Sequence, residues 1–330
     1  MYDCGLSIFQ TQKEMVDNNI EIDLIYLWVD GNDPQWQKKK QVFTGVVSDN
    51  SEQNNIGRYV NNDELKYALR SAEKYAPWIR RIFIVTDNQK PDWLNITHPK
   101  IRVVDHREIM PPEILPCFNS SVIEYFLYKI PDLAEHFLFA NDDMFFNAHS
   151  SPDFFFGKDG FPIVRLKRKP FGKWHYRLKF LVGKKLGQYN DMLKVSSLMV
   201  EEKFGKYYPG VPHHNIDAYK KSDYHKAVEV VFKEQVRESQ SHRLRAYGDL
   251  HRSAFGYYIL AIGHGHLLYV GRSESIRILA HRHNFKERLQ RYKPSLFCLN
   301  DSQRVKDEHR KKIKPFLEEL FPEESAFEQR

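Results

Sequence analysis

Four apolar runs in the first part of the chain, each ending in polar residues, constrain the fold more than any other feature. They are IDLIYLWV from Ile22, IFIVT from Ile82, IRVV from Ile101 and HFLFA from His136. Continuous apolar runs of this length are typical of strands that are buried on both faces. Helical patterns lie between the runs, at 61–78 and 120–136. The chain is therefore predicted to alternate strands and helices.

This alternation predicts an α/β fold with a mostly parallel sheet, because parallel strands need crossover connections, usually helical. The chain has 330 residues, 42% of them hydrophobic, which is enough for a sizeable core. We interpret it as one domain. Its predicted parts are an α/β core at about 20–150, a basic insertion at 151–210, a helical part at 211–301 that completes the active site, and a C-terminal helix at 302–330.

Aspartates follow the predicted strands at the points where they end. They are Asp30, Asp87, Asp105, Asp142 and Asp143. Ligands of parallel sheets bind beyond the carboxyl ends of the strands. Any one of these acids could be an ordinary loop residue, but five together favour a shared site. The adjacent pair in HFLFANDDMFF resembles the acids with which nucleotide-sugar enzymes hold a divalent cation, since Mg²⁺ prefers carboxylate and phosphate oxygens.

Histidines and arginines supply the other candidates, since the sequence contains no P-loop, GxGxxG, HExxH or GxSxG motif. His213 and His214 are adjacent in GVPHHNID. A histidine can take a proton from a hydroxyl nucleophile near neutral pH, although a surface or capping pair is the alternative interpretation. Arg245, in HRLRAYGD, is of the residue type that binds phosphate bidentately.

Residues 165–185 contain nine Lys or Arg and no acid, interleaved with aromatic residues, in a chain of net charge +7. Such a segment would attract an anionic glycan, a phosphorylated substrate or an acidic membrane surface. A solvated basic face is the alternative. No nucleic-acid-binding motif accompanies the segment, so no nucleic acid is expected as a partner.

The cysteines and the apolar segments predict where the protein works. Cys4, Cys117 and Cys298 have no metal-binding spacing, which favours a reducing compartment. The N-terminal residues lack the pattern of a secretory signal, and no apolar run is long enough to cross a membrane. We expect a cytoplasmic protein that contacts the inner face of the membrane peripherally through residues 165–185.

Four blocks of the sequence carry a resemblance to a known family. They are IDLIYLWVDGNDP; RYVNNDELKYALRSAEKYAPWIRRIFIVTDNQKPDWL with LPCFNSSVIE and FLFANDDMFF; VPHHNIDAYKK with RAYGDLHRSAFGYY; and KPSLFCLND. Together with their spacers they span about 22–301. In these blocks the sequence resembles the Stealth proteins, which are bacterial capsular polysaccharide phosphotransferases and the animal GlcNAc-1-phosphotransferase.

The resemblance implies a Rossmann-like, glycosyltransferase-A-like fold that transfers a sugar 1-phosphate, such as GlcNAc-1-phosphate, in capsular or exopolysaccharide synthesis. The implied partners are a nucleotide-sugar donor, for example UDP-GlcNAc, and a polysaccharide or lipid-linked glycan acceptor, with Mg²⁺ or Mn²⁺ as cofactor. The implied catalytic residues are Asp142, Asp143, His213 or His214, and Arg245. The implied donor-binding residues are Asp30, Gly31, Arg58, Asp63, Arg70, Asn119 and Asn300, and the implied metal ligands are Asp143 and Asp301.

Two other functions stay open on the residues alone. An ordinary glycosyltransferase would use the same donor and similar acids, but would attack the anomeric carbon of the sugar. A non-catalytic protein that binds a glycan or a lipid surface would need no convergent site, so its polar strand ends would be scattered.

Overall fold

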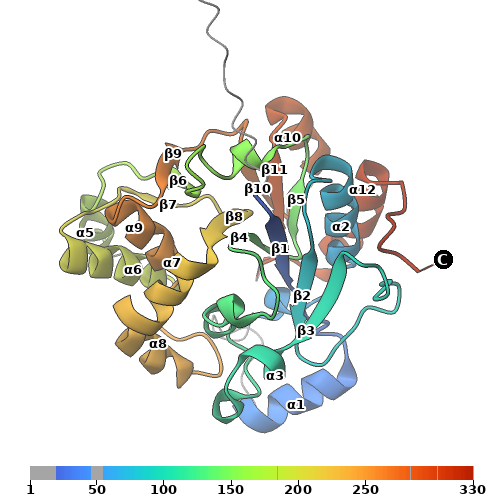
Figure 1. Cartoon of the computed structure of the whole chain (residues 1–330), viewed down its shortest axis with the longest axis horizontal. Helices are drawn as coiled ribbons and strands as arrows, with labels where there is room; N and C mark the ends of the chain where they lie inside the picture. Colours follow the sequence, from blue (N-terminus) through green and yellow to red (C-terminus); the bar gives the residue numbers. More distant parts are fainter. Residues whose placement is uncertain (1–19, 46–54, 184, 283, 303, 330) are drawn as a thin grey trace, which may run out of the picture.

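The four apolar runs of the sequence form four adjacent strands of a five-stranded sheet (Figure 1). The computed structural model describes residues 20–45, 55–183, 185–282, 284–302 and 304–329. The strand order is β3 (Ile101–Asp105), β2 (Ile82–Thr86), β1 (Ile22–Leu27), β4 (His136–Asn141) and β8 (Asp217–Lys220). Residues 1–19, to which the prediction about a secretory signal refers, lie outside the described ranges.

The first four strands of the chain are parallel, and only β8 runs antiparallel to its neighbour. The predicted α/β fold with a mostly parallel sheet is therefore confirmed. Parallel pairing brings the carboxyl ends of β1 to β4 to one edge of the sheet, where polar residues follow each strand.

Both faces of the sheet are buried, as the continuous apolar runs predicted. On β1, Leu24 and Tyr26 belong to one hydrophobic cluster, and Ile25 belongs to the other. On β4, Leu138 and Phe139 point to opposite clusters in the same way. Because successive side chains alternate between the faces of a strand, each run has to be apolar throughout.

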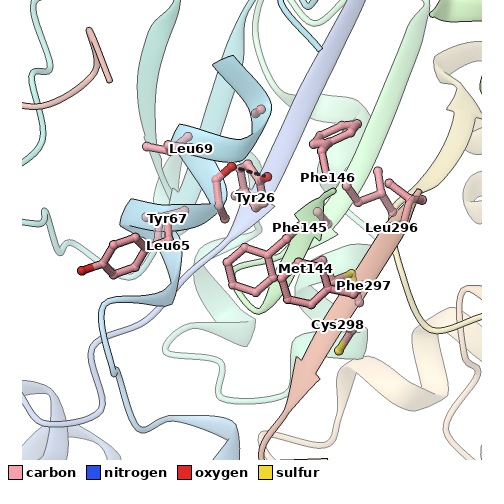
Figure 2. Close-up of a cluster of buried hydrophobic side chains, with 14 of the residues drawn as sticks. Tyr26, Leu65, Tyr67, Leu69, Met144, Phe145, Phe146, Leu296, Phe297 and Cys298 are labelled. Carbon is pink, nitrogen blue, oxygen red and sulfur yellow. Dashed lines mark hydrogen bonds between the residues drawn. The ribbon is translucent and has the colours of Figure 1, made fainter. Parts of the chain in front are cut away.

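A second sheet continues the chain beyond β4. It consists of β10 (Ser275–Leu279), β11 (Leu296–Asn300) and β5 (Met144–Phe146), with β5 antiparallel to β11. Phe145 of β5 stacks on Phe297 of β11 at 4.7 Å between ring centroids. Figure 2 shows these side chains packed together with Leu65 and Leu69 of α2 (Glu64–Tyr75). The apolar face predicted for this helix is confirmed.

The C-terminal half adds a third sheet and most of the helices (Figure 1). The third sheet has the order β7 (Gly210–Pro212), β6 (Ile163–Arg168) and β9 (His266–Tyr269). The helices of this half are α5 (Trp174–Leu181), α6 (Gln188–Phe204), α7 (Lys221–Lys226), α8 (Lys233–Gln240), α9 (Ser253–Ala261) and α10 (Phe285–Tyr292). The predicted basic insertion at 151–210 thus contains β6, α5 and α6.

The remaining helices depart from the sequence prediction in two places. They are α1 (Pro34–Thr44), α3 (His106–Ile109), α4 (Ser120–Glu124), α11 (Asp307–Arg310) and α12 (Ile313–Leu320). The helix predicted at 120–136 ends at Glu124, and a separate 3₁₀ turn covers Leu127–Lys129. The C-terminal helix predicted at 302–330 is wrong as a single element. Pro315 lies in the first turn of α12, where the missing N–H costs nothing, whereas one continuous helix would place it in the interior.

None of the helices within the described ranges combines the length and the apolar character that crossing a lipid bilayer requires.

Candidate active site

A cavity of about 340 Å³ lies at the carboxyl ends of the parallel strands. Its lining includes the residues that follow β1, β4 and β11, together with parts of the C-terminal half. The charged residues in the lining are Arg58, Glu64, Asp87, Asp142, Asp143, Arg245, Arg277 and Asp301. Residues from distant parts of the sequence therefore converge on one site, as the acids at the strand ends suggested.

The acid pair Asp142 and Asp143 forms the turn between β4 and β5. The chain leaves the five-stranded sheet at Asn141 and enters the second sheet at Met144. The amide of Leu299 on β11 donates to the carbonyl of Asp143 at 2.9 Å, which holds the turn against the second sheet. The two carboxylates are fixed where the sheets meet, and both line the cavity.

A third carboxylate, Glu64 at the start of α2, lines the cavity beside this pair. It accepts hydrogen bonds from the backbone and side-chain nitrogens of Asn62, both at 2.7 Å. Burial raises the pKa of Glu64 to about 7, and the charge of Asp143 adds to the rise. Burial and the charges of Glu64 and Asp143 raise the pKa of Asp142 well above its usual range. The charge of Asp143 thus raises the pKa of both other acids.

Asp143 and Asp301 complete the acidic wall. Burial raises the pKa of Asp143 to about 6, with a smaller contribution from the charge of Asp301. One oxygen of Asp143 accepts from the Cys298 thiol at 3.3 Å, while the other is buried and has no hydrogen-bond partner within the described ranges. Asp301 is held by Arg310, whose Nε donates to it at 2.8 Å, but burial still raises its pKa.

Arginines line the cavity together with this acidic wall. Arg58, Arg245 and Arg277 all belong to the lining. Gln188 joins two of their segments, because its amide donates to the Arg245 carbonyl at 2.6 Å and accepts from Arg58 at 3.3 Å. Arg245 donates to the hydroxyl of Ser120, and its buried Nε has no partner among the described residues. Among the described residues, the cavity therefore places one unpartnered donor, Arg245 Nε, together with one unpartnered acceptor, an oxygen of Asp143.

The structure separates the two adjacent histidines. His214 lines the cavity and adopts a left-handed backbone conformation with φ of 60°. Its Nδ1 lies 3.5 Å from the hydroxyl of Tyr189, which also lines the cavity. Burial lowers the pKa of His214 to about 3, and the charges of Arg277, Arg252 and Arg245 lower it further. The imidazole is consequently neutral at neutral pH.

His213 instead belongs to a buried ionic network. Its Nε2 lies 3.1 Å from Asp217, which accepts from Arg252 at 3.0 Å. Arg252 also donates to Glu124 at 3.1 Å. The side chain of His213 is fully buried and is not part of the cavity lining. Of the two alternatives, the structure therefore favours His214 over His213 as a site residue.

Glycines allow the walls of the cavity to approach one another. A Cβ on Gly57 would lie 2.5 Å from the Asp301 carboxylate, and a Cβ on Gly31 would lie 2.3 Å from the Tyr59 carbonyl. Tyr59 lines the cavity, so Gly31 supports a wall although it is not part of the lining itself. Asp30 is also outside the lining, and its carboxylate accepts from the amide of Asn32 at 2.9 Å, closing the turn after β1.

Three of the predicted donor-binding residues serve the fold outside the cavity. Arg70 is buried and pairs bidentately with Glu328 at 2.7 and 2.8 Å, which ties the C-terminal segment to α2. Asn119 caps α4 and donates to Asp249 at 2.9 Å. Asp63 pairs with Lys314 on the surface at 2.7 Å. Their hydrogen-bonding groups already have protein partners, so we assign them no contact with a donor.

Sequence reasoning missed several residues of the lining. Glu64, Tyr189 and Arg277 are the polar side chains among them that bear most directly on the chemistry. Glu64 lies at the start of a helix, where acids are common, and Arg277 lies within the apolar strand pattern SIRIL. The signal that could have identified Arg277 is a charged residue inside an otherwise apolar strand.

A divalent cation fits the acidic wall only if a ligand completes its coordination. Within the described ranges, no three His, Cys, Asp or Glu side chains form a ready metal-binding group. However, Asp143 has a buried oxygen without a partner among the described residues, and the charges of Glu64 and Asp143 raise the pKa of Asp142. Mg²⁺ commonly takes one or two carboxylates together with substrate phosphates and waters. The donor set therefore suits a cation that arrives with a diphosphate.

Two family models match the chain. "Stealth protein CR1, conserved region 1" covers residues 21–43, and "Stealth protein CR2, conserved region 2" covers residues 58–164. The second match includes β4 and the acid pair, and Asn141 of β4 and both acids line the cavity.

Curated relatives match along most of the chain. The capsular polysaccharide phosphotransferase fcs1 of Haemophilus influenzae is 32% identical over 309 residues, covering 88% of this chain and 81% of that protein. The exopolysaccharide phosphotransferase SCO2594 of Streptomyces coelicolor is 34% identical over 331 residues, covering 93% of this chain. The chain spans only about half of that second relative, 51% of its length.

Among solved structures, the galactosyltransferase LgtC in complex with donor and acceptor sugar analogs aligns with 84% of this chain and 86% of its own. The sequence identity is 12% and the TM-score is 0.41. A score this low carries no argument about function.

Proposed function

This chain belongs to the Stealth family, and from this premise we propose that it transfers a sugar 1-phosphate from a nucleotide sugar to a hydroxyl of a glycan acceptor. The product would be a phosphodiester in a capsular or exopolysaccharide. The names of the relatives support the reaction class, and the cavity at the sheet edge supports the chemistry.

One observation carries the proposal: a single cavity combines an acidic wall with several arginines. A diphosphate dianion needs cationic groups around its oxygens, and arginine supplies paired N–H donors for them. A divalent cation on the same diphosphate needs carboxylates. Asp143 and Arg245 line one cavity, and each has a buried polar atom that no residue in the described part of the chain contacts by a hydrogen bond. A metal-bound diphosphate would satisfy both.

The proposed reaction is attack of an acceptor hydroxyl oxygen on the sugar-proximal phosphorus. The new bond joins the acceptor oxygen to that phosphorus, and the bond from phosphorus to the bridging oxygen breaks. A nucleoside monophosphate leaves with the electron pair. The acceptor proton has to pass to a base, because an alcohol is a weak acid at neutral pH.

We assign the base to Asp142 and supporting roles to the other polar residues. Burial among acids raises the pKa of Asp142, which makes its carboxylate a stronger base than an exposed aspartate. His214 is neutral and can donate a hydrogen bond without carrying a proton away. Arg245 and Arg58 would bind the phosphoryl oxygens and stabilise the charge that develops in the transition state.

Asp143 and Asp301 are the residues we propose for Mg²⁺ or Mn²⁺, with Asn300 beside them in the lining. When bound, the cation would neutralise charge on the diphosphate and on the leaving phosphate. A lipid-linked acceptor would bring the enzyme to a membrane, and residues 165–185 are the segment that would contact it.

The released nucleotide tests the proposal. Purified protein would be incubated with a panel of nucleotide sugars, a capsule-type acceptor and Mg²⁺ or Mn²⁺, and the nucleotide product separated by chromatography. We expect the monophosphate, together with phosphorus in the glycan. The diphosphate, with no phosphorus in the glycan, would instead identify an ordinary glycosyltransferase that attacks carbon. No turnover with any donor, together with glycan binding, would identify a non-catalytic binding protein.

A further inference from the structure

Helix α5 carries apolar side chains on the side that faces solvent. Phe171, Trp174, Leu178 and Leu181 recur at intervals of three and four residues, so they lie along one side of the helix and the turn before it. Their exposed fractions are 72%, 58%, 43% and 77%. A helix of a globular protein normally turns such a stripe towards the core. Figure 1 shows α5 at the outer edge of the molecule, next to α6.

Contacts on the other side of α5 fix this orientation. Tyr176 is buried, and the Lys169 ammonium lies 4.8 Å from the centre of its ring. Lys173 pairs with Glu201 of α6 at 2.8 Å. The stripe therefore cannot turn inward without breaking the contacts that attach α5 to α6.

The backbone before α5 is strained in a way that keeps an aromatic ring outside. Phe171 has a φ of 65°, a left-handed conformation that is unfavourable for a bulky side chain. Such strain persists only where the surrounding structure maintains it, and it is concentrated at functional segments. Here it accompanies a phenylalanine that is 72% exposed.

Positive charge surrounds the apolar stripe. Lys179 and Lys185 follow Leu178 and Leu181 by one and four residues, and the segment 165–185 contains no acid. In the part of the chain that the structure describes, no acidic group pairs with Lys169 or Lys179. Burial lowers the pKa of Lys169 to about 8, and the nearby charge of Lys179 contributes. An anionic surface would relieve this repulsion.

The combination of residues identifies the partner. Interfaces between proteins are depleted in lysine, and a hydroxyl-rich glycan offers nothing to leucine side chains. Helices that lie in the surface of a bilayer combine Trp, Phe and Leu on one face with Lys or Arg beside it. We propose that the α5 surface, formed by Phe171, Trp174, Leu178, Leu181 and Val182 with Lys179 and Lys185, docks this protein on an anionic bilayer.

Docking there would place the active site close to the membrane. Residues 182–187 connect α5 to α6, and Tyr189 in the first turn of α6 lines the cavity. The chain between Leu181 and Tyr189 can span at most about 30 Å. Docking goes beyond the proposed reaction and does not depend on it, so it can be measured with vesicles alone.

The test is flotation of the purified protein with lipid vesicles. One set would be pure phosphatidylcholine, and the other would contain about one third phosphatidylglycerol. We expect binding to the anionic vesicles, weakened by salt, and little binding to the neutral ones. Leu178→Asp with Leu181→Asp should weaken binding at least about tenfold, because both apolar anchors are lost. Lys179→Glu with Lys185→Glu should weaken it similarly.

Matched changes on another element serve as controls. Val230, which is 66% exposed, and the exposed Lys226 lie outside α5, so Val230→Asp and Lys226→Glu should bind vesicles like the unchanged protein. The activity of every variant on a short water-soluble acceptor should also be unchanged, which shows intact folding. Absence of binding to anionic vesicles would overturn the proposal, as would equal binding by the α5 variants. Self-association abolished by Leu181→Asp, without vesicle binding, would assign the surface to a second copy instead.

Discussion

The acidic wall of the cavity (the acidic side) and its three arginines (the arginine side) are built in different ways. The acids Asp142 and Asp143 are neighbours in sequence and occupy one turn at the junction of two sheets. The arginines Arg58, Arg245 and Arg277 come from three segments far apart in the sequence. The acidic side therefore follows from strand order alone, whereas the arginine side depends on how the C-terminal half folds back over the sheet.

On both sides, charges of one sign affect the pKa of neighbouring groups. Besides burial, the charges of Glu64 and Asp143 raise the pKa of Asp142, and the charges of Arg277 and Arg245 lower the pKa of His214. Each side would be relieved by charge of the opposite sign. A metal-bound diphosphate carries both signs, so the comparison leads to distinct expectations for the two sides. The acids should act mainly on turnover and the arginines mainly on donor binding.

The largest effect is expected on the acidic side. Asp142→Asn should lower kcat by about two orders of magnitude or more, because a lost transition-state contact of about 3 kcal/mol has that consequence. Asp143→Asn should act in the same direction. Steady-state kinetics with saturating donor would measure it. Asp105→Asn is the matched control, since Asp105 also follows a strand but caps α3, and asparagine caps equally well. Full activity in both cavity variants would remove the acids from the mechanism.

A smaller effect is expected on the arginine side. Arg245→Lys keeps the charge but loses the planar pair of donors, so the donor KM should rise about tenfold while kcat falls less. Arg237→Lys on the exposed surface of α8 should leave both constants unchanged. A fall in kcat without any change in KM would contradict the division of labour between the two sides.

Glu64 predicts a pH dependence of stability. Its pKa is raised from 4.5 to about 7 in the folded protein, so the folded state holds the proton to higher pH than the unfolded chain does. The free-energy cost of ionising Glu64 in the folded protein is absent below about pH 4.5 and grows as pH rises towards 7. Glu64→Gln should therefore gain stability relative to the unchanged protein over that window, by about 1 kcal/mol or more at pH 7. Urea unfolding at pH 5 and pH 7 would measure the difference in the free energy of unfolding between the variant and the unchanged protein. A difference that is the same at both pH values would refute the prediction.

The smallest effect is expected for Asp63, which precedes the cavity residue Glu64 in sequence but is not part of the cavity lining. Asp63 pairs with Lys314 at the surface, 2.7 Å apart, with side-chain exposures of 32% and 57%. Such pairs contribute little, so Asp63→Asn should change the free energy of unfolding by less than about 1 kcal/mol and leave the donor KM unaltered. A clear rise in donor KM would bring Asp63 back into the donor site.

Sequence alone predicted the sheet because its signal is local. The runs that became β1 to β4 are apolar throughout, and that pattern depends only on burial of both faces. The helix predicted at 120–136 failed because residues 121–128 are buried on every side, so their pattern carried no helical period. The acid pair could be found from the sequence because it directly follows one of these apolar runs.

The rest of the site depends on tertiary contacts that no local pattern reports. His213 and His214 look equivalent in sequence, but a positive φ at His214 sends only one of them into the cavity. Arg70 and Arg245 are both arginines within the Stealth-like blocks. Arg70 pairs with Glu328 near the C-terminal end of the described chain, whereas Arg245 has a buried Nε with no partner among the residues that the structure describes. Only the folded arrangement distinguishes a structural arginine from one available to a substrate.

The most direct test of the account is a structure of the protein with a nucleotide-sugar donor and Mn²⁺, the ion being located by its anomalous scattering. The account predicts the diphosphate in the cavity between the two sides, with Mn²⁺ against Asp143 and Asp301 and with Arg245 on the phosphate oxygens. A donor bound outside this cavity, or a diphosphate that touches neither the acids nor the arginines, would contradict it.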